Sequence, residues 1–168
     1  MNTKKITKAG MLLAIGTVLH YIVPPLFLGV KPDFLLATMF IGLMIVDDIK
    51  SAISIALAAG ILSALTTGFP GGEIPNIIDK LVSGLFVFYL YHGLLKELSK
   101  STSSFLIGLL GTVISGGVFL ASALVIVGIP FTFMAGMIGI VMPTAIANSI
   151  MLIFLAKVSK IAEQQLAN

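Results

Sequence analysis

The stretch Pro70-Gly-Gly-Glu-Ile-Pro-Asn-Ile-Ile-Asp-Lys80 leads from a turn into an otherwise apolar helix. It places four polar side chains at the mouth of that helix, namely Glu73, Asn76, Asp79 and Lys80. If the helix begins near Pro75, which a first helical turn tolerates, successive residues step by about 100° around its axis. The four side chains and Ser83 then share one face. Because charges inside a membrane usually mark a substrate or ion site, we expect this face to line a cavity.

The composition indicates that this helix belongs to a membrane protein. Hydrophobic residues make up 58% of the 168 positions and charged residues only 10%, whereas an ordinary soluble chain is about 25% charged. A spanning helix needs roughly 20 apolar residues, so the chain has room for six spans and none for a soluble domain. We therefore predict an all-α integral membrane protein, a six-transmembrane-helix bundle with residues 1–168 in a single domain.

Clusters of Pro, Gly and charged residues divide the chain into its predicted spans. They are Ala9–Val23, Phe34–Val46, Ser51–Leu65, Ile74–Leu95, Phe105–Val127 and Phe133–Ala156. The second span is shorter than a full crossing requires, so it could extend through Asp47, thin the bilayer or cross only part of it. Between the fourth and fifth spans, Lys96 to Ser104 forms the only sustained hydrophilic stretch.

The positions of the lysines predict the orientation, since the chain contains no arginine. One side of the six-span arrangement receives Lys4, Lys5, Lys8, Lys50, Lys96, Lys100, Lys157 and Lys160. Only Lys31 and Lys80 lie on or near the other side. By the positive-inside rule both termini are cytoplasmic, and the mouth of the polar face opens outward. The net charge of +3 then reflects orientation and does not indicate nucleic-acid binding.

Small residues recur at four-residue spacing on two of the predicted spans. The third span carries Ala52, Ala56, Gly60 and Ala64, and the first carries Gly10 and Ala14. Such stripes let helix backbones approach closely. We interpret the stripe on the third span as packing within the bundle, whereas the pair on the first could pack internally or contact a membrane partner.

Two further polar residues have alternative interpretations. Asn148 lies in the middle of the sixth span, where it could hydrogen-bond to a neighbouring helix or contact a ligand. His20 lies at the outer end of the first span, where we expect it to anchor the helix at the membrane interface rather than to bind a ligand.

Several classes of chemistry have no matching motif. The chain has no cysteine, and its two histidines are far apart, so we predict no metal site and no cofactor. No phosphate-binding loop occurs, so the chain is not expected to hydrolyse ATP. The common membrane-protease motifs are absent as well, and we predict that the protein is not an enzyme.

The segment from Thr66 to Lys80 reads Thr-Thr-Gly-Phe-Pro-Gly-Gly-Glu-Ile-Pro-Asn-Ile-Ile-Asp-Lys, and it follows Leu19-His20, Pro24-Pro25 and Lys31-Pro32-Asp33. Together these segments resemble the tryptophan-specific S-component family of energy-coupling factor (ECF) transporters. The resemblance extends over essentially the whole chain. It implies a substrate-binding subunit of the bacterial cell membrane that captures its ligand from outside.

The resemblance also implies protein partners. S-components work with a separate membrane coupling subunit and two ATPases, and their first helix carries a small-x-x-x-small contact for the coupling subunit. Gly10 and Ala14 match this contact, with glycine where alanine is the more familiar first residue. Glu73 stands where the family often has glutamine, which argues against an essential charge at that position.

Chemistry and resemblance together suggest how the ligand is held. A tryptophan zwitterion needs a cation for its carboxylate, an anion or carbonyls for its ammonium and an apolar slot for its indole. Lys80 or Lys31 suits the carboxylate. Asp33 or Asp79 suits the ammonium. The expected substrate-binding residues are Lys31, Asp33, Thr67, Phe69, Glu73, Asn76, Asp79, Lys80 and Asn148.

The aromatic residues at the outer end supply the remaining contacts. Phe69, Phe131 and Phe133 could close over the indole ring, and Asn76 or Asn148 could bind its polar end. Asp79 and Lys80 are adjacent and point about 100° apart, so we do not expect them to pair directly. Pairing with Lys31 or Asp33 would instead neutralise them.

Three functions remain open from the sequence. The first is an ECF-type subunit that takes up tryptophan, and the second is the same kind of subunit for another small aromatic ligand. The third is a stand-alone ion-coupled carrier for an amino acid, in which Asp79 would be the proton site.

Overall fold

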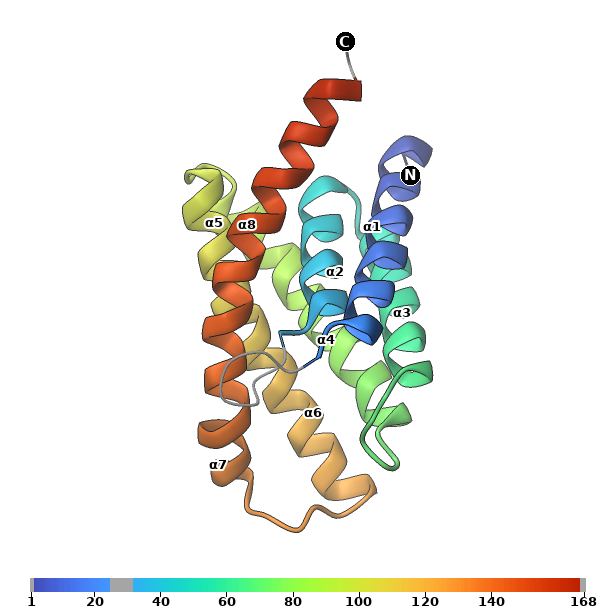
Figure 1. The fold of residues 1–168 in the computed structure, drawn as a ribbon, viewed down its shortest axis with the longest axis vertical. Helices are drawn as coiled ribbons and strands as arrows, with labels where there is room; N and C mark the ends of the chain where they lie inside the picture. Colours follow the sequence, from blue (N-terminus) through green and yellow to red (C-terminus); the bar gives the residue numbers. More distant parts are fainter. Residues whose placement is uncertain (1, 25–31, 167–168) are drawn as a thin grey trace.

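The computed structural model describes residues 2–24 and 32–166, with side chains as far as residue 159 (Figure 1). All regular structure in these residues is helical. The first three helices are α1 (Thr3–Ile22), α2 (Phe34–Ile45) and α3 (Ile49–Leu65). A fourth rod joins α4 (Glu73–Leu90) to the π-helical turn η2 (Tyr91–Leu95). The fifth comprises α5 (Lys100–Leu106), η3 (Ile107–Gly111) and α6 (Thr112–Ile126), and the sixth comprises α7 (Phe133–Gly136), η4 (Met137–Val141) and α8 (Met142–Leu166).

The six rods agree with the predicted number of helices. Three of them are long and apolar enough to cross a membrane, namely Glu73–Leu95, Lys100–Ile126 and Phe133–Ser159. The predicted boundaries need three corrections, one of which is the end of the sixth rod, at Leu166 instead of Ala156. The first helix begins at Thr3 instead of Ala9, and the fifth rod begins at Lys100, inside the predicted hydrophilic stretch, because Ser99 accepts a hydrogen bond from Thr102 N and caps the helix.

The short helix α2 lies at the centre of the bundle. It ends at Ile45, before Asp47, and every residue from Leu35 to Leu43 is buried. The helix contacts α1, α3, α4, α8 and η3. Protein therefore surrounds α2 on most sides, and its 12 residues can be short because they need not contact lipid along their whole length.

The small-residue stripe on α3 packs against α4, which confirms the prediction for that stripe. A Cβ atom added to Gly84 on α4 would lie 2.7 Å from the Cβ of Ala56, and one added to Gly60 would lie 3.1 Å from the Cα of Ile77. These backbones are so close that larger side chains cannot fit between them.

The helix α1 packs mainly on α2 and leaves another face uncovered. Ala9, Leu13 and Gly16 are its buried residues. Gly10 and Ala14 are exposed, and a Cβ atom at Gly10 would meet nothing within 4 Å. The stripe on α1 therefore has no partner within the described part of the chain.

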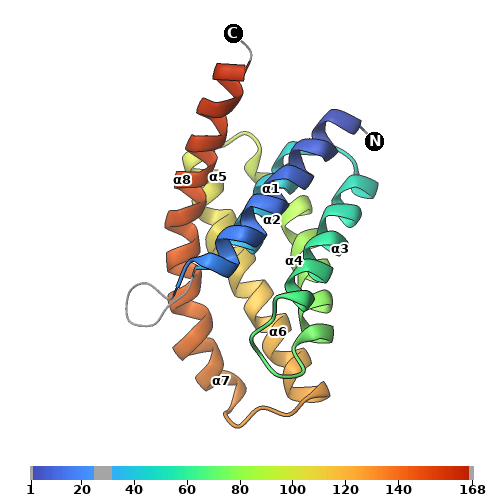
Figure 2. The same cartoon turned by 45° about the vertical axis from the view of Figure 1, so that its right-hand side comes forward.

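Both termini lie at one end of the bundle, and two views show the same arrangement (Figures 1 and 2). The connections between α2 and α3 and between η2 and α5 lie at this end, where Lys5 on α1 hydrogen-bonds to Asp47. We call it the terminal end. The connections between α3 and α4 and between α6 and α7 lie at the opposite end, and each contains a glycine with positive φ, Gly71 at 73° and Gly128 at 79°.

Candidate functional site

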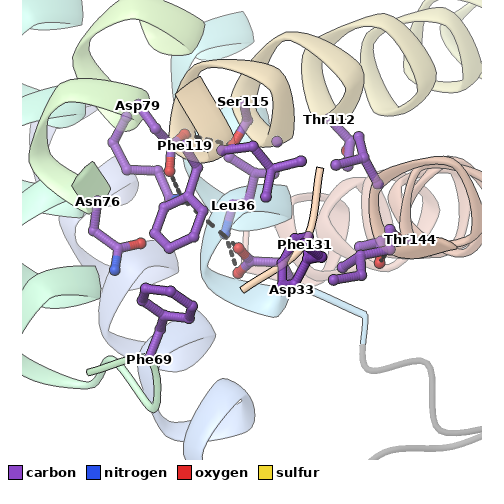
Figure 3. A pocket seen from close by; sticks show the side chains of 15 residues that line it. Asp33, Leu36, Phe69, Asn76, Asp79, Thr112, Ser115, Phe119, Phe131 and Thr144 are labelled. Carbon is purple, nitrogen blue, oxygen red and sulfur yellow. Dashed lines mark hydrogen bonds and ion pairs between the residues drawn. The ribbon is translucent and has the colours of Figure 1, made fainter. Parts of the chain in front are cut away.

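A cavity of about 280 Å³ lies between the helices (Figure 3). Phe69 and Phe131 of its wall belong to the connections at the end opposite the terminal end. Its polar lining residues are Asp33, Asn76, Asp79, Lys80, Thr112, Ser115 and Thr144. The remainder of its wall is Leu36, Phe69, Gly116, Phe119, Leu120, Phe131, Ile140 and Val141. Residues from α2, α4, α6 and the sixth rod therefore meet around one space.

A buried cluster of three charges forms the polar wall of the cavity. Lys80 Nζ lies 2.7 Å from Asp79 Oδ2 and 3.8 Å from Asp33 Oδ2. Lys80 is 2% exposed and Asp79 is 1% exposed. Lys80 thus pairs with Asp33, which is one of the alternatives that the sequence left open. The expectation that Asp79 and Lys80 would not pair directly is wrong, because the long lysine side chain folds back across the angle between the two Cβ directions.

Asp33 is positioned by contacts on several sides. Its Oδ1 accepts a hydrogen bond from Leu36 N at 3.0 Å, so the side chain caps α2. Its own backbone N–H donates to Asn148 Oδ1 at 2.8 Å. His20 Nδ1 lies 3.2 Å from Asp33 Oδ1, which is an ion-pair distance without hydrogen-bond alignment. His20 thus approaches the site, although we expected it to anchor α1 at the interface.

Asn148 connects three helices and is not among the cavity-lining residues. Besides accepting from Asp33 N, it donates from Nδ2 to Thr112 Oγ1 at 3.1 Å. Of the two alternatives left open by the sequence, this geometry corresponds to the bond between helices. Thr112 itself lines the cavity, so Asn148 holds two lining residues in place.

The Asp79 carboxylate accepts more hydrogen bonds than the Asp33 carboxylate does. Ser115 Oγ, from α6, donates to Asp79 Oδ1, and Ser83 Oγ lies 3.4 Å from the same oxygen. Lys80 occupies the other oxygen. The Asp79 carboxylate therefore accepts hydrogen bonds on both oxygens. The Asp33 carboxylate accepts one, from Leu36 N on Oδ1, its Oδ2 lies 3.8 Å from Lys80 Nζ, and its side chain remains 23% exposed.

Asn76 and Thr67 stabilise the turn before α4. Asn76 Oδ1 accepts from Ser63 Oγ at 2.8 Å, and its Nδ2 donates to Gly72 O at 2.8 Å. Thr67 Oγ1 accepts from Phe69 N at 3.3 Å. Asn76 also lines the cavity, but Thr67 does not.

Two other predicted site residues have different outcomes. Glu73, the first residue of α4, is exposed and is not among the lining residues. Lys31 lies outside the described residues.

Phenylalanine side chains form the apolar wall. Phe69 and Phe119 meet edge to face, with ring centroids 5.6 Å apart and an interplanar angle of 83°. Phe131 approaches from the connection between α6 and α7 (Figure 3). Phe133, which we expected to close over a ring, is not among the lining residues.

Sequence reasoning missed the contribution of α6. Five of its residues line the cavity, namely Thr112, Ser115, Gly116, Phe119 and Leu120. They recur at spacings of three and four and so form one helical face. The available signal was the spacing of the polar and aromatic residues among them, at three and four positions. This signal is weak because the remainder of the helix is apolar, so that every face of it could contact lipid.

The arrangement suits a small ligand with a charged end and a flat apolar end. Two carboxylates and one ammonium give the cluster an excess negative charge, which favours a cationic ligand group. The rings opposite supply apolar and edge-to-face contacts. No group of three or more metal-ligating side chains occurs among the described residues.

A multi-helix membrane bundle around such an amphiphilic cavity is typical of membrane transport proteins. Within that class, the chain belongs to the family described as "Tryptophan transporter TrpP", whose model matches residues 2–163.

Relatives of similar length support the same assignment. A probable tryptophan transport protein of Clostridium acetobutylicum is 44% identical over 93% of this chain and 92% of its own. Proteins of the same description from Bacillus subtilis and Clostridium perfringens are 42% and 37% identical, over 92% and 89% of this chain and 90% and 87% of theirs. No solved structure matches the chain. The family resemblance is thus confirmed, and the chain is a multi-pass transport protein of the bacterial cell membrane.

Proposed function

We propose that this protein takes up tryptophan as the substrate-binding subunit of an ECF importer, and that tryptophan occupies the cavity between α2, α4 and α6. The observation that carries the proposal is the pairing of a largely buried charge cluster with a wall of phenylalanine rings around one cavity. The family and the names of the relatives supply the identity of the substrate.

The ammonium group of tryptophan binds Asp33 in this proposal. Asp79 already has Lys80 on one oxygen and Ser115 on the other, whereas Asp33 is 3.8 Å from Lys80 and partly exposed. Of the two carboxylates considered from the sequence, Asp33 therefore retains more capacity for a new charged hydrogen bond.

The carboxylate of tryptophan binds Lys80. An ammonium has three donors, and Asp79 uses one of them at 2.7 Å, so two remain for the ligand and for Asp33. Binding would exchange the long contact between Lys80 and Asp33 for two shorter contacts with the ligand zwitterion. The cluster thus gains one positive and one negative partner without a change in net charge.

The indole ring lies among Phe69, Phe119 and Phe131. A cavity of about 280 Å³ is just below the range of roughly 300–1,000 Å³ for ordinary ligand pockets, which suits a ligand as small as a single amino acid. Thr144 Oγ1 lines the same space and donates to Ile140 O at 2.7 Å, so its lone pairs can accept from the indole N–H.

The cavity opens to the outside of the cell in this proposal. Lys4, Lys5, Lys8, Lys50, Lys96, Lys100 and Lys157 belong to elements at the terminal end of the bundle. The positive-inside rule assigns that end, with both termini, to the cytoplasm. The loops beside Phe69 and Phe131 then face outward, where substrate is captured.

Energy for uptake comes from separate proteins. The sequence has no phosphate-binding loop, and the exposed stripe of Gly10 and Ala14 offers close backbone contact to a membrane coupling subunit. Two ATPases complete the importer.

Competition binding tests the substrate assignment. The chain contains no tryptophan, so the fluorescence of added tryptophan can be followed without background from the protein. We expect tight binding of tryptophan in detergent without ATP or an ion gradient, and at least tenfold weaker binding of tyrosine and phenylalanine. Equal competition by either amino acid would reject indole recognition.

Reconstitution into lipid vesicles tests which energy source drives tryptophan uptake. Vesicles containing this chain alone should not accumulate tryptophan under a proton or sodium gradient, whereas vesicles that also contain the coupling subunit and ATPases should do so with ATP. Accumulation by the chain alone would favour the stand-alone carrier with Asp79 as the proton site.

A further inference from the structure

We infer that the terminal end of the bundle carries a binding site for the phosphate headgroup of an anionic phospholipid, between α5, α8 and the end of α2. Two adjoining pockets of about 100 Å³ and 380 Å³ lie here and share Lys100, Ser104 and Ala156. They are separate from the tryptophan cavity, with which they share no lining residue. The helices α5 and α8 lie side by side at this end in both views (Figures 1 and 2).

The charged residues that line these two pockets are all positive. Lys100 and Lys157 are its only charged members among the described residues. Neither lysine has an ion-pair partner within the part of the chain whose side chains are described. Two lysines that line adjoining pockets without a carboxylate among the lining residues favour an anion.

Ser104 supplies an independent observation. It is fully buried, it lines both pockets, and its Oγ has no hydrogen-bond partner in the described structure. Buried hydroxyls in helices normally find a nearby carbonyl, as Ser103 Oγ does with Leu95 O at 2.7 Å and Ser149 Oγ with Ala145 O at 2.6 Å. Ser104 instead keeps a donor free beside the two lysines.

The apolar part of the lining favours a lipid over a soluble anion. Ile153 and Ala156 on α8 line the larger pocket, and Ile41 and Met44 on α2 line the smaller one. A phosphodiester bound to the lysines and Ser104 would place its glycerol and the first acyl carbons against these side chains. Basic pockets between helices near a membrane surface bind anionic headgroups in this manner.

Native mass spectrometry of the detergent-purified protein tests the inference. Phosphatidylglycerol and phosphatidylcholine would be titrated separately into wild type, the double variant K100Q/K157Q and the variant S104A. We expect wild type to bind phosphatidylglycerol at least tenfold more tightly than phosphatidylcholine. K100Q/K157Q should lose about tenfold or more of its affinity for phosphatidylglycerol, and S104A should lose a smaller part.

The matched control is K4Q/K50Q, which removes the same charge from exposed lysines at the same end of the molecule. It should keep the affinity of wild type for phosphatidylglycerol. Equal binding of the two lipids by wild type, an equal loss in K4Q/K50Q, or unchanged binding in S104A would each overturn the proposed site. Unchanged elution on gel filtration and an unchanged unfolding temperature establish that each variant is folded.

Two further outcomes distinguish other occupants. If millimolar glycerol 3-phosphate displaces phosphatidylglycerol, the pocket is a site for soluble anions and the lipid assignment is wrong. If wild type shows no lipid preference but K100Q/K157Q loses copurification with the ATPases, the surface belongs to a protein interface and the lipid assignment is again wrong.

Discussion

At the scale of residues, the sequence predicted which side chains of α4 line the cavity but did not predict how they pair. Helical spacing placed Asn76, Asp79 and Lys80 on one face, and all three line the cavity. Spacing could not predict the pairing of Lys80 with Asp79, because the four methylene groups of lysine let its ammonium reach well away from the direction of its Cβ atom.

Neutralising Lys80 should weaken tryptophan binding. We expect Lys80→Met to cost about 1.5–3 kcal/mol of binding free energy, the contribution of a charged hydrogen bond. Titration by ligand fluorescence measures this loss. The matched control is Glu73→Gln on the same helix, whose side chain is exposed and outside the cavity lining. Equal affinities in the two variants would reassign Lys80 to structural pairing.

The two carboxylates should differ in their effects. Asp33→Asn should weaken tryptophan binding more than Asp79→Asn, because Asp79 is already engaged by Lys80 and Ser115. Asp79→Asn should mainly lower the unfolding temperature, since it leaves the buried Lys80 without its closest anion. A larger loss of binding in Asp79→Asn would move the ammonium site to Asp79.

The contact between Lys5 and Asp47 should be sensitive to acid. The hydrogen bond from Lys5 lowers the pKa of Asp47 from its ordinary value of 3.8. Since the folded-state pKa is the lower one, the contact stabilises the fold above pH 3.8 and this contribution is lost as the pH falls through the folded value. Carboxyl NMR should show Asp47 titrating below 3.8, and Lys5→Gln should raise its pKa. An unchanged pKa in that variant would contradict the contact.

At the scale of elements, the small-residue stripes have two different roles. The helix α4 packs against the stripe on α3, with close approaches at Gly60 and Gly84. Gly10 and Ala14 on α1 are exposed, and we call them the open stripe. The sequence predicted both stripes by spacing alone. It left the partner of the second open, because spacing identifies a smooth face but does not specify what covers it.

Larger side chains on the open stripe should abolish uptake without weakening tryptophan binding. Gly10→Leu and Ala14→Leu should leave tryptophan affinity unchanged, because the cavity lies toward the other end of the bundle. Uptake by cells that contain the coupling subunit and ATPases should collapse, since bulky side chains prevent close helix approach.

The matched control for the open stripe is Gly93→Leu. Gly93 is also exposed and has nothing within 4 Å of an added Cβ atom, so this variant should retain uptake. Normal uptake by the α1 variants would remove that stripe from the coupling contact.

At the scale of the whole molecule, hydropathy predicted the class of protein and the number of helices. It did not predict how the helices rotate about their axes. Eight of the 15 lining residues come from α6 and the sixth rod, and most of these eight are apolar, as lipid-facing residues are. The packing of Gly111 against Phe40 and of Gly116 against Val141 shows which face turns inward. The hydrogen bonds that link Ser115 to Asp79 and Asn148 to Thr112 show the same face. The charged wall was therefore predictable, and most of the apolar wall was not.

Tryptophan binding in the cavity between α2, α4 and α6 can be observed directly. A crystal structure of the protein with a brominated tryptophan tests it most directly, because the anomalous signal of bromine locates the indole ring. We predict a single bromine peak among Phe69, Phe119 and Phe131, with the carboxylate on Lys80, and we predict that excess tryptophan removes the peak. A peak outside this cavity that tryptophan displaces would contradict the claim.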